Sequence, residues 1–524
     1  MGSIKAFFFF GLFALIFGVP SLTNASPASP EGAAELHVKP LYSAAALAPG
    51  ESTTVKMLIT IEAPTVIHKA KRPPVAVSLV IDKSGSMEEA RKMAYAKTAG
   101  RLLINNLGPD DLFSLTTYDN AVKVLAPLQP VKDKNRLLKL IDGIIPDGMT
   151  FLSGGLEKGV EQLKTVRHEG PSRVILLSDG LANVGVTQPE MVAAIGAKAR
   201  NTGVGVTTIG LGLDFNEDLM QLLAQRGGGQ YYYIKDSEYL PSVFAQELKL
   251  VADSFTRDLR VTFTRPSAIS RAKVYGYSTT AKDMTLDIEM SDIASDEKRL
   301  IMLDLTITPD VASGKQTLGT VDFAYTDQDG ALRQISLPVE LDVLADAATR
   351  GQAEKQNEAA TRQVREEALL LEVDEAHVEA IKELQKGNAS RAKQILRAQQ
   401  TALAAAPENK VAVNKLARIK QDEAQMDAAQ HDPAMQNKIA KAGKASAYMS
   451  AKGQTQGIML RKGDSGFMVE RLQTALKQAG YYAPPINGVY GDDVENAVKD
   501  LQKAKSIIVD GIAGPATLQA LGLD

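Results

Sequence analysis

Between residues 75 and 254, short apolar segments alternate with longer segments of helical periodicity. The apolar segments have the length of strands, and the helical patterns lie between them. The expected strands are Val75–Asp82, Asp111–Tyr118, Arg173–Asp179, Gly205–Gly210 and Tyr231–Ile234. Strands that alternate with helices in this way form a parallel sheet with helices on its faces. We therefore predict a Rossmann-like, doubly wound α/β domain over residues 75–254.

The remaining segments predict further domains, as expected for a chain of 524 residues. Residues 35–72 and 256–345 alternate apolar and polar side chains, which indicates strands. The strands of 35–72 are too few for a stable sheet of their own, so we expect one β-sandwich into which the α/β domain is inserted. Residues 346–450 are rich in Ala, Gln, Glu and Lys and predict a helical region, although the polar stretch 421–457 resembles a loose linker. Residues 458–524 predict a compact domain with a core of three short helices.

The first 25 residues have the pattern of a secretory signal peptide. Lys5 precedes an apolar run from Ala6 to Val19, and Ala25 ends a small-residue cleavage site. The run is shorter than the roughly 20 residues that span a bilayer, so cleavage is favoured over an uncleaved anchor. We expect export to the periplasm or cell wall, with no membrane-spanning segment after cleavage.

The composition excludes several function classes. Lys and Arg number 59 against 62 Asp and Glu, and this net charge of −3 lacks the excess that neutralises the phosphates of nucleic acids. The chain has no Cys, which excludes disulfides, thiolate metal sites and Cys nucleophiles. It has five His, none at metal-ligand spacing, which disfavours a zinc enzyme.

Oxygen-bearing side chains follow two of the expected strands. The first strand ends at Asp82 and is followed by Ser84 and Ser86, and Asp179 ends a later strand. Thr150 lies on the loop between them. In open α/β sheets, ligands bind beyond the carboxyl ends of the strands. Carboxylates and hydroxyls are hard donors, so these five residues predict a Mg²⁺ site, with Mn²⁺ or Ca²⁺ as alternatives.

These five residues, with the D-x-S-x-S pattern at their start, resemble the metal-ion-dependent adhesion site of the von Willebrand factor A (VWA) domain. The resemblance covers residues 75–254. It implies that the Ser and Thr hydroxyls contact the metal directly, that the Asp residues act through water, and that an acidic residue of a protein partner completes the coordination. Two alternatives stay open: a metal with a purely structural role, and a chance turn or helix-cap pattern.

Residues 460–521 resemble the bacterial peptidoglycan-binding three-helix domain. The resemblance rests on Leu460-Arg461, on Leu472-Gln473 and Leu501-Gln502, and on the paired turns Asn487-Gly488 and Asp510-Gly511. It implies that the domain binds peptidoglycan. Candidate contacts are Arg461, Tyr481, Tyr482 and Tyr490; alternatively, the tyrosines complete the small core.

No catalytic constellation is visible in the sequence. Ser-x-x-Lys occurs at Ser270–Lys273 and at Ser390–Lys393, but neither is accompanied by Lys-Thr-Gly. We predict a non-enzymatic envelope protein, with no catalytic residues, that binds peptidoglycan and a protein partner in adhesion or scaffolding. The alternative is a peptidoglycan-modifying enzyme whose catalytic site is not recognisable. A third class, partners of cytoplasmic ATPases, conflicts with the signal peptide.

Overall fold

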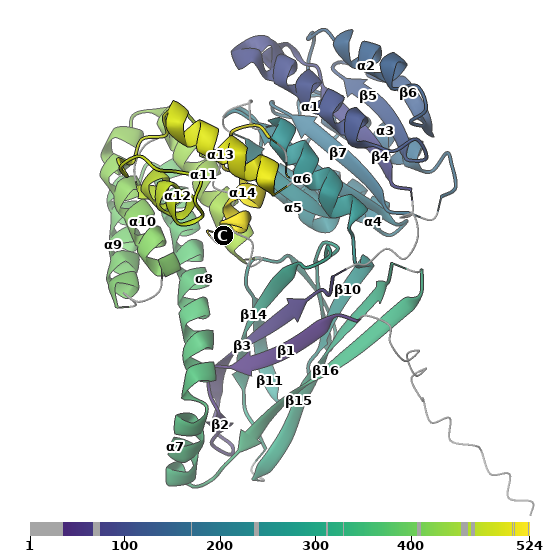
Figure 1. Cartoon of the computed structure of the whole chain (residues 1–524). Coiled ribbons are helices and arrows are strands. Elements are labelled where there is room, and N and C mark those ends of the chain that lie inside the picture. Colours follow the sequence, from purple (N-terminus) through teal and green to yellow (C-terminus); the bar gives the residue numbers. More distant parts are fainter. Residues whose placement is uncertain are drawn as a thin grey trace, which may run out of the picture. The chain divides into compact units, whose positions relative to one another are not determined.

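A computed structural model describes most of the chain (Figure 1). The described residues are 35–65, 74–168, 170–234, 240–310, 313–328, 330–405, 410–451, 460–462, 467–505, 507, 509–521 and 523. The predicted signal peptide lies outside them. Among the helices within these ranges, none is both long and apolar enough to cross a membrane.

The α/β domain has a six-stranded sheet in the order β6-β5-β4-β7-β8-β9. Its parallel strands are β4 (Ala76–Asp82), β5 (Leu112–Tyr118), β7 (Ser172–Ser178), β8 (Val204–Leu211) and β9 (Gly228–Ile234). These strands confirm the predicted α/β fold class. Strand β6 (Val122–Pro130), which the sequence pattern did not predict, pairs antiparallel with β5 at the edge of the sheet.

Helices cover both faces of this sheet. On one face, α1 (Lys92–Asn106), α2 (Lys134–Asp142) and α6 (Leu240–Ala252) pack against Val77, Leu79 and Ile81 of β4. On the other, α3 (Leu152–Leu163), α4 (Pro189–Arg200) and α5 (Glu217–Arg226) pack against Ala76 and Val80. Every residue of β4 is buried, because alternate side chains enter two different cores. This burial explains why β4 is a continuous apolar run in the sequence.

The strands flanking the α/β domain in sequence form the β-sandwich. One sheet has the order β1-β3-β14-β11 and the other β12-β13-β10-β15-β16-β2. Strand β3 (Thr53–Glu62), which precedes the α/β domain, pairs with β14 (Lys298–Ile307), which follows it, from Thr53↔Ile307 to Glu62↔Lys298. The chain therefore leaves the sandwich, forms the α/β domain and returns. The other strands are β1 (His37–Tyr42), β2 (Ala46–Leu47), β10 (Arg257–Thr264), β11 (Ile269–Val274), β12 (Thr279–Lys282), β13 (Thr285–Ile288), β15 (Gly314–Thr326) and β16 (Leu332–Val343).

The helical region comprises α7 (Ala347–Gln356), α8 (Glu358–Gln385), α9 (Ala389–Ala404), α10 (Lys410–Ala429) and α11 (Pro433–Ala451). Within the described residues 421–451, the expected loose linker is wrong, because this stretch is largely helical. Helix α11 instead packs on the α/β domain. Lys441 and Lys444 of α11 are buried. Lys441 donates to Glu217 at 2.7 Å, and Lys444 donates to Glu217 at 3.0 Å and to Asp218 at 2.9 Å. The ring of Tyr448 packs edge-on against that of Tyr231.

The C-terminal domain contains α12 (Phe467–Gln478), α13 (Asp492–Ala504) and α14 (Pro515–Ala520). Two buried glutamines organise it. The Gln473 side chain of α12 accepts from the Asn487 and Gly488 N–H groups and donates to Asn487 Oδ1. Gln502 of α13 forms the same three bonds with Asp510 and Gly511. The paired turns seen in the sequence are therefore two copies of one hydrogen-bonded unit.

Gly159 lets α3 lie close to β4. A Cβ atom at Gly159 would lie 2.5 Å from Val80 Cγ2, too close for two carbon atoms. In α7, a Cβ at Gly351 would meet nothing within 4 Å.

We predict that Gly159→Ala destabilises the α/β domain by about 1–3 kcal/mol, because α3 must move away from the sheet. Gly351→Ala is the matched control and should stabilise α7 by about 0.5–1 kcal/mol, because alanine favours an open helical position. Hydrogen exchange measured by mass spectrometry should show faster exchange in β4 for the first variant and slower exchange in α7 for the second. Equal effects in both helices would contradict the close packing.

Candidate functional site

The parallel pairing of β4 with β7 brings two aspartates to one edge of the sheet. Asp82 is the last residue of β4, and Asp179 directly follows the last residue of β7. The two strands are in register up to Ile81 and Leu177. Both aspartates are fully buried, with no exposed surface. Two carboxylates removed from water at one point require hydrogen bonds or positive charge around them.

Asp82 is held by hydrogen bonds from both strands. Its Oδ1 accepts from the Ser84 backbone N–H at 2.9 Å, and its Oδ2 accepts from the Ser178 hydroxyl at 2.8 Å. Burial raises the pKa of Asp82 to about 6, although the bonds from Ser84 and Ser178 oppose this shift. The role of Ser178 was missed by the sequence analysis, although its position directly before Asp179 could have indicated it.

The two predicted serines contact the second aspartate. Ser86 Oγ donates to Asp179 Oδ1 at 2.8 Å, and Ser84 Oγ lies 3.5 Å from the same oxygen. The two serine hydroxyls are 3.2 Å apart. The structure therefore brings Asp82, Ser84, Ser86 and Asp179 into one connected cluster.

Thr150 reaches the cluster from the loop before α3. Gly85 N–H donates to the Gly148 carbonyl oxygen, Thr150 N–H donates to Asn183 Oδ1, and Asn183 N–H donates to the Thr150 carbonyl oxygen. These bonds hold the loop against its neighbours. A Cβ atom at Gly180 would lie 3.2 Å from Thr150 Oγ1 and 3.7 Å from Ser86 Oγ. The two hydroxyls thus flank Gly180, whose missing side chain leaves space between them.

The residues fit a hard divalent cation. Hydroxyl and carboxylate oxygens gather around the space beside Gly180, which a side chain would fill. The described residues contain no group of three or more His, Cys, Asp or Glu placed to hold a metal. Metal binding here would therefore depend on the serine and threonine hydroxyls.

A buried lysine, which the sequence analysis missed, completes the cluster. Lys92 Nζ lies 2.7 Å from Asp179 Oδ2 and 3.4 Å from the Ser86 carbonyl oxygen. The exposed fraction of the Lys92 side chain is 5% and that of Asp179 is 0%. Lys92 is the first residue of α1 and lies in register with buried Ala96 and Ala99, a pattern that could have indicated it.

The backbone before Lys92 is strained. Ala90 and Arg91 have φ values of 47° and 58°, in the left-handed region that side chains other than glycine seldom adopt. These two residues end the 3₁₀ segment Gly85–Arg91 and redirect the chain into α1. Strain of this kind persists only where the surroundings impose it. We infer that the buried Lys92–Asp179 pair helps to impose it.

We predict that Lys92→Met lowers the free energy of unfolding of the α/β domain by about 3–5 kcal/mol in a chelator, because Asp179 loses its buried partner. The same variant should bind Mg²⁺ more tightly than the wild type, since no ammonium then competes for Asp179. Denaturation and isothermal titration calorimetry would measure the two effects.

Lys97→Met on the same helix is the control, because within the described part of the chain Lys97 Nζ makes one hydrogen bond, an exposed one to the Asp142 carbonyl oxygen. It should change neither quantity appreciably. Weaker Mg²⁺ binding in Lys92→Met would mean that the lysine positions Asp179 for the cation and does not compete with it.

The candidate peptidoglycan contacts divide into two groups. Tyr482 and Tyr490 are 4% and 1% exposed. Tyr482 donates to Asp493 at 2.9 Å, and Tyr490 donates to the Gly511 carbonyl oxygen at 3.0 Å. Their burial favours the alternative that these two tyrosines stabilise the core. Tyr481 and Arg461 are partly exposed.

Two family models match the chain. Residues 77–246 match the von Willebrand factor type A domain, and residues 465–521 match a putative peptidoglycan binding domain. The chain therefore carries both domains that the sequence resembled. The expected boundaries, 75–254 and 458–524, extend slightly beyond these matches.

Relatives and a solved structure agree with this assignment. The uncharacterised protein YfbK of Escherichia coli is 24% identical to this chain over 275 residues. The match covers 51% of this chain and 48% of YfbK, so the chain spans about half the length of this relative. A probable N-acetylmuramoyl-L-alanine amidase of Bacillus licheniformis is 46% identical over 77 residues, 14% of this chain and 22% of the amidase, in the peptidoglycan-binding region alone. The solved structure of a von Willebrand factor type A protein from Catenulispora acidiphila superposes with a TM-score of 0.59 at 16% sequence identity. The superposition covers 80% of this chain and 97% of the solved chain, which shows that the two share a fold.

Proposed function

We propose that this chain is an exported, non-enzymatic protein of the bacterial envelope that joins peptidoglycan to a protein partner. The C-terminal domain would hold the cell wall, and the VWA domain would bind the partner through a divalent cation. The observation that carries the proposal is the convergence of Asp82, Ser84, Ser86, Thr150 and Asp179 at one edge of the sheet, on a chain that also carries a peptidoglycan-binding domain.

The cation would be held by the three hydroxyls and the two buried carboxylates. Bound Mg²⁺ would supply a site for an acidic side chain of the partner, and Mn²⁺ or Ca²⁺ are the alternatives. Lys92 would offset one of the two carboxylate charges. The remaining negative charge is small, which keeps the cation able to attract a further carboxylate.

Exposed apolar side chains beside the site support a protein as the partner. Met149, directly before Thr150, is 53% exposed, and Leu181, two residues after Asp179, is 58% exposed. Their loops are joined by hydrogen bonds between Thr150 and Asn183. Large exposed apolar groups beside a polar centre are typical of protein interaction sites.

Mg²⁺ binding should require the Asp82 carboxylate. We expect Asp82→Asn to weaken Mg²⁺ binding at least tenfold in calorimetry, whereas Asp142→Asn, which alters an exposed ion pair with Arg101, should leave it unchanged. The raised pKa of Asp82 means that the carboxyl group is largely protonated below about pH 6. Wild-type affinity should therefore fall between pH 7.5 and pH 5.5 as protons compete with the cation.

The capture of envelope proteins by the immobilised chain separates metal binding from partner binding. The wild type should retain a partner in Mg²⁺ and release it in chelator. The double variant Met149→Ser, Leu181→Ser should keep its Mg²⁺ affinity and lose the partner. Capture that persists in chelator and in Asp82→Asn would refute the adhesion mechanism.

The C-terminal domain should bind isolated sacculi. We expect the full chain to sediment with sacculi, and Arg461→Ala with Tyr481→Ala to reduce the bound fraction several-fold, because these candidate residues are partly exposed. Gln478→Ala, at the exposed end of α12, is the control. Release of soluble wall fragments during the incubation would instead favour the peptidoglycan-modifying enzyme.

A further inference from the structure

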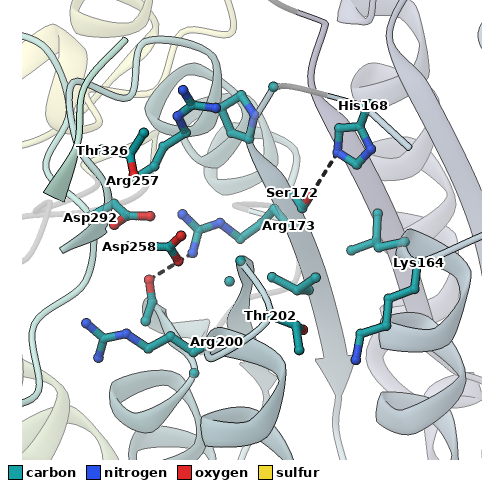
Figure 2. Close-up of a pocket in the computed structure, with 18 of the residues that line it drawn as sticks. Lys164, His168, Ser172, Arg173, Arg200, Thr202, Arg257, Asp258, Asp292 and Thr326 are labelled. Carbon is teal, nitrogen blue, oxygen red and sulfur yellow. Dashed lines mark hydrogen bonds between the residues drawn. The ribbon is translucent and has the colours of Figure 1, made fainter. Parts of the chain in front are cut away.

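A pocket lies at the opposite end of β7 from the candidate metal site. Its volume is about 470 Å³, within the range of small-molecule sites. Ser172 and Arg173 at the start of β7 and Val204 at the start of β8 form its floor. Figure 2 shows Asp258 and Asp292 on one side of the pocket, Lys164 and His168 on the other, and Arg173 between them. The seven residues of β7 separate the pocket from Asp179 by about 20 Å.

Basic side chains outnumber acidic ones around this pocket. The basic residues of its lining are Lys164, Arg167, Arg173, Arg200 and Arg257, with His168 beside them. Asp258 and Asp292 are the acidic residues of the described lining. Concave sites lined mainly by one sign of charge concentrate ions of the opposite sign.

Three of the arginines donate to backbone carbonyl groups, Arg257 to that of Asp327 at 3.0 Å. Arg173 is 8% exposed and its Nη1 donates to the Gly228 carbonyl oxygen at 3.0 Å, while its Nε has no hydrogen-bond partner and lies 3.6 Å from Glu247. Arg200 Nη2 donates to the carbonyl oxygens of Leu259 and Met290. The carbonyl groups orient the guanidinium groups of Arg173 and Arg200, and carboxylates compensate part of their charge: Glu247 forms an ion pair with Arg173, and Asp292 interacts with both arginines. Burial lowers the pKa of Arg200, which is consistent with this incomplete compensation.

Two further positive charges, those of Lys164 and Arg167, lie at the entrance of the pocket without a carboxylate partner among the described residues. The side chains of Lys164 and Arg167 are exposed and make no hydrogen bond or ion pair with any described residue. His168 Nε2 lies 2.7 Å from the Ser172 hydroxyl. This contact fixes the orientation of the imidazole ring beside the start of β7. At Asp258 the backbone takes a left-handed φ of 55°, which is strain of the kind that gathers at functional sites.

We propose that this pocket binds a small oxyanion that carries two or more negative charges, such as a phosphate group or a dicarboxylate. The buried Arg173 would provide a fixed charge at the floor, and Lys164 and Arg167 would attract the anion at the entrance. Guanidinium groups bind carboxylate and phosphate oxygens through charge-assisted hydrogen bonds. The site is independent of the proposed metal and wall contacts, since it uses none of their residues.

Calorimetric titration of the full chain with inorganic phosphate, pyrophosphate and succinate, at constant ionic strength, tests this proposal. We expect saturable binding of at least one of these ions at one site per chain. The double variant Lys164→Gln, Arg167→Gln should bind at least tenfold more weakly. Both side chains are exposed, and an unchanged unfolding temperature would show that the variant is folded.

The matched control is Lys123→Gln with Lys132→Gln, which removes two exposed charges near β6. It should retain wild-type affinity within about twofold. Preference for phosphate and pyrophosphate identifies a phosphate-bearing ligand, and preference for succinate identifies a carboxylate-bearing one. Absence of saturable binding to the wild type, or equal weakening in both double variants, overturns the proposal.

Discussion

Two carboxylates buried at one edge of a sheet must be compensated, and much of the VWA domain is arranged around that requirement. The parallel register of β4 and β7 makes the approach of Asp82 and Asp179 unavoidable. Hydroxyl groups satisfy part of their hydrogen-bonding capacity, and the Lys92 ammonium supplies the positive charge. The strained turn at Ala90 and Arg91 is where the chain bends to bring that ammonium inward. The same geometry that suits a cation thus also suits the protein without one.

The sequence predicted the parts of this structure that follow from periodicity and strand ends. Strands β4 and β7 are apolar on both faces, so their ends, and hence Asp82 and Asp179, could be placed with no other information. Strand β6 was missed because Pro127 and Pro130 interrupt it, and only an edge position tolerates them. Helix α11 was partly missed because its polar residues suggest solvent, whereas Lys441 and Lys444 are buried against carboxylates that lie far away in sequence.

The helical region contributes directly to the packing of the α/β domain. In α11, Lys441 forms an ion pair with Glu217 and Lys444 forms one with Asp218, both at the start of α5. Tyr448 packs against Tyr231 of β9. Helix α5 covers one face of the VWA sheet. Helix α11 therefore extends one core of the α/β domain, through Ala445 and Tyr448.

The two glutamine-clamped turns of the C-terminal domain have an architectural consequence. Gln473 and Gln502 each make the same three hydrogen bonds to the turn that follows their helix. The two units are joined as well, because Gln502 donates to Thr517 of α14 and Tyr490 donates to the Gly511 carbonyl oxygen. The repeated pattern is what a tandem duplication would produce. The outer residues of each half are free to diverge, since the clamp needs only a glutamine, an Asn or Asp, and a glycine. Such freedom lets the outer surface of the domain vary while its interior stays the same.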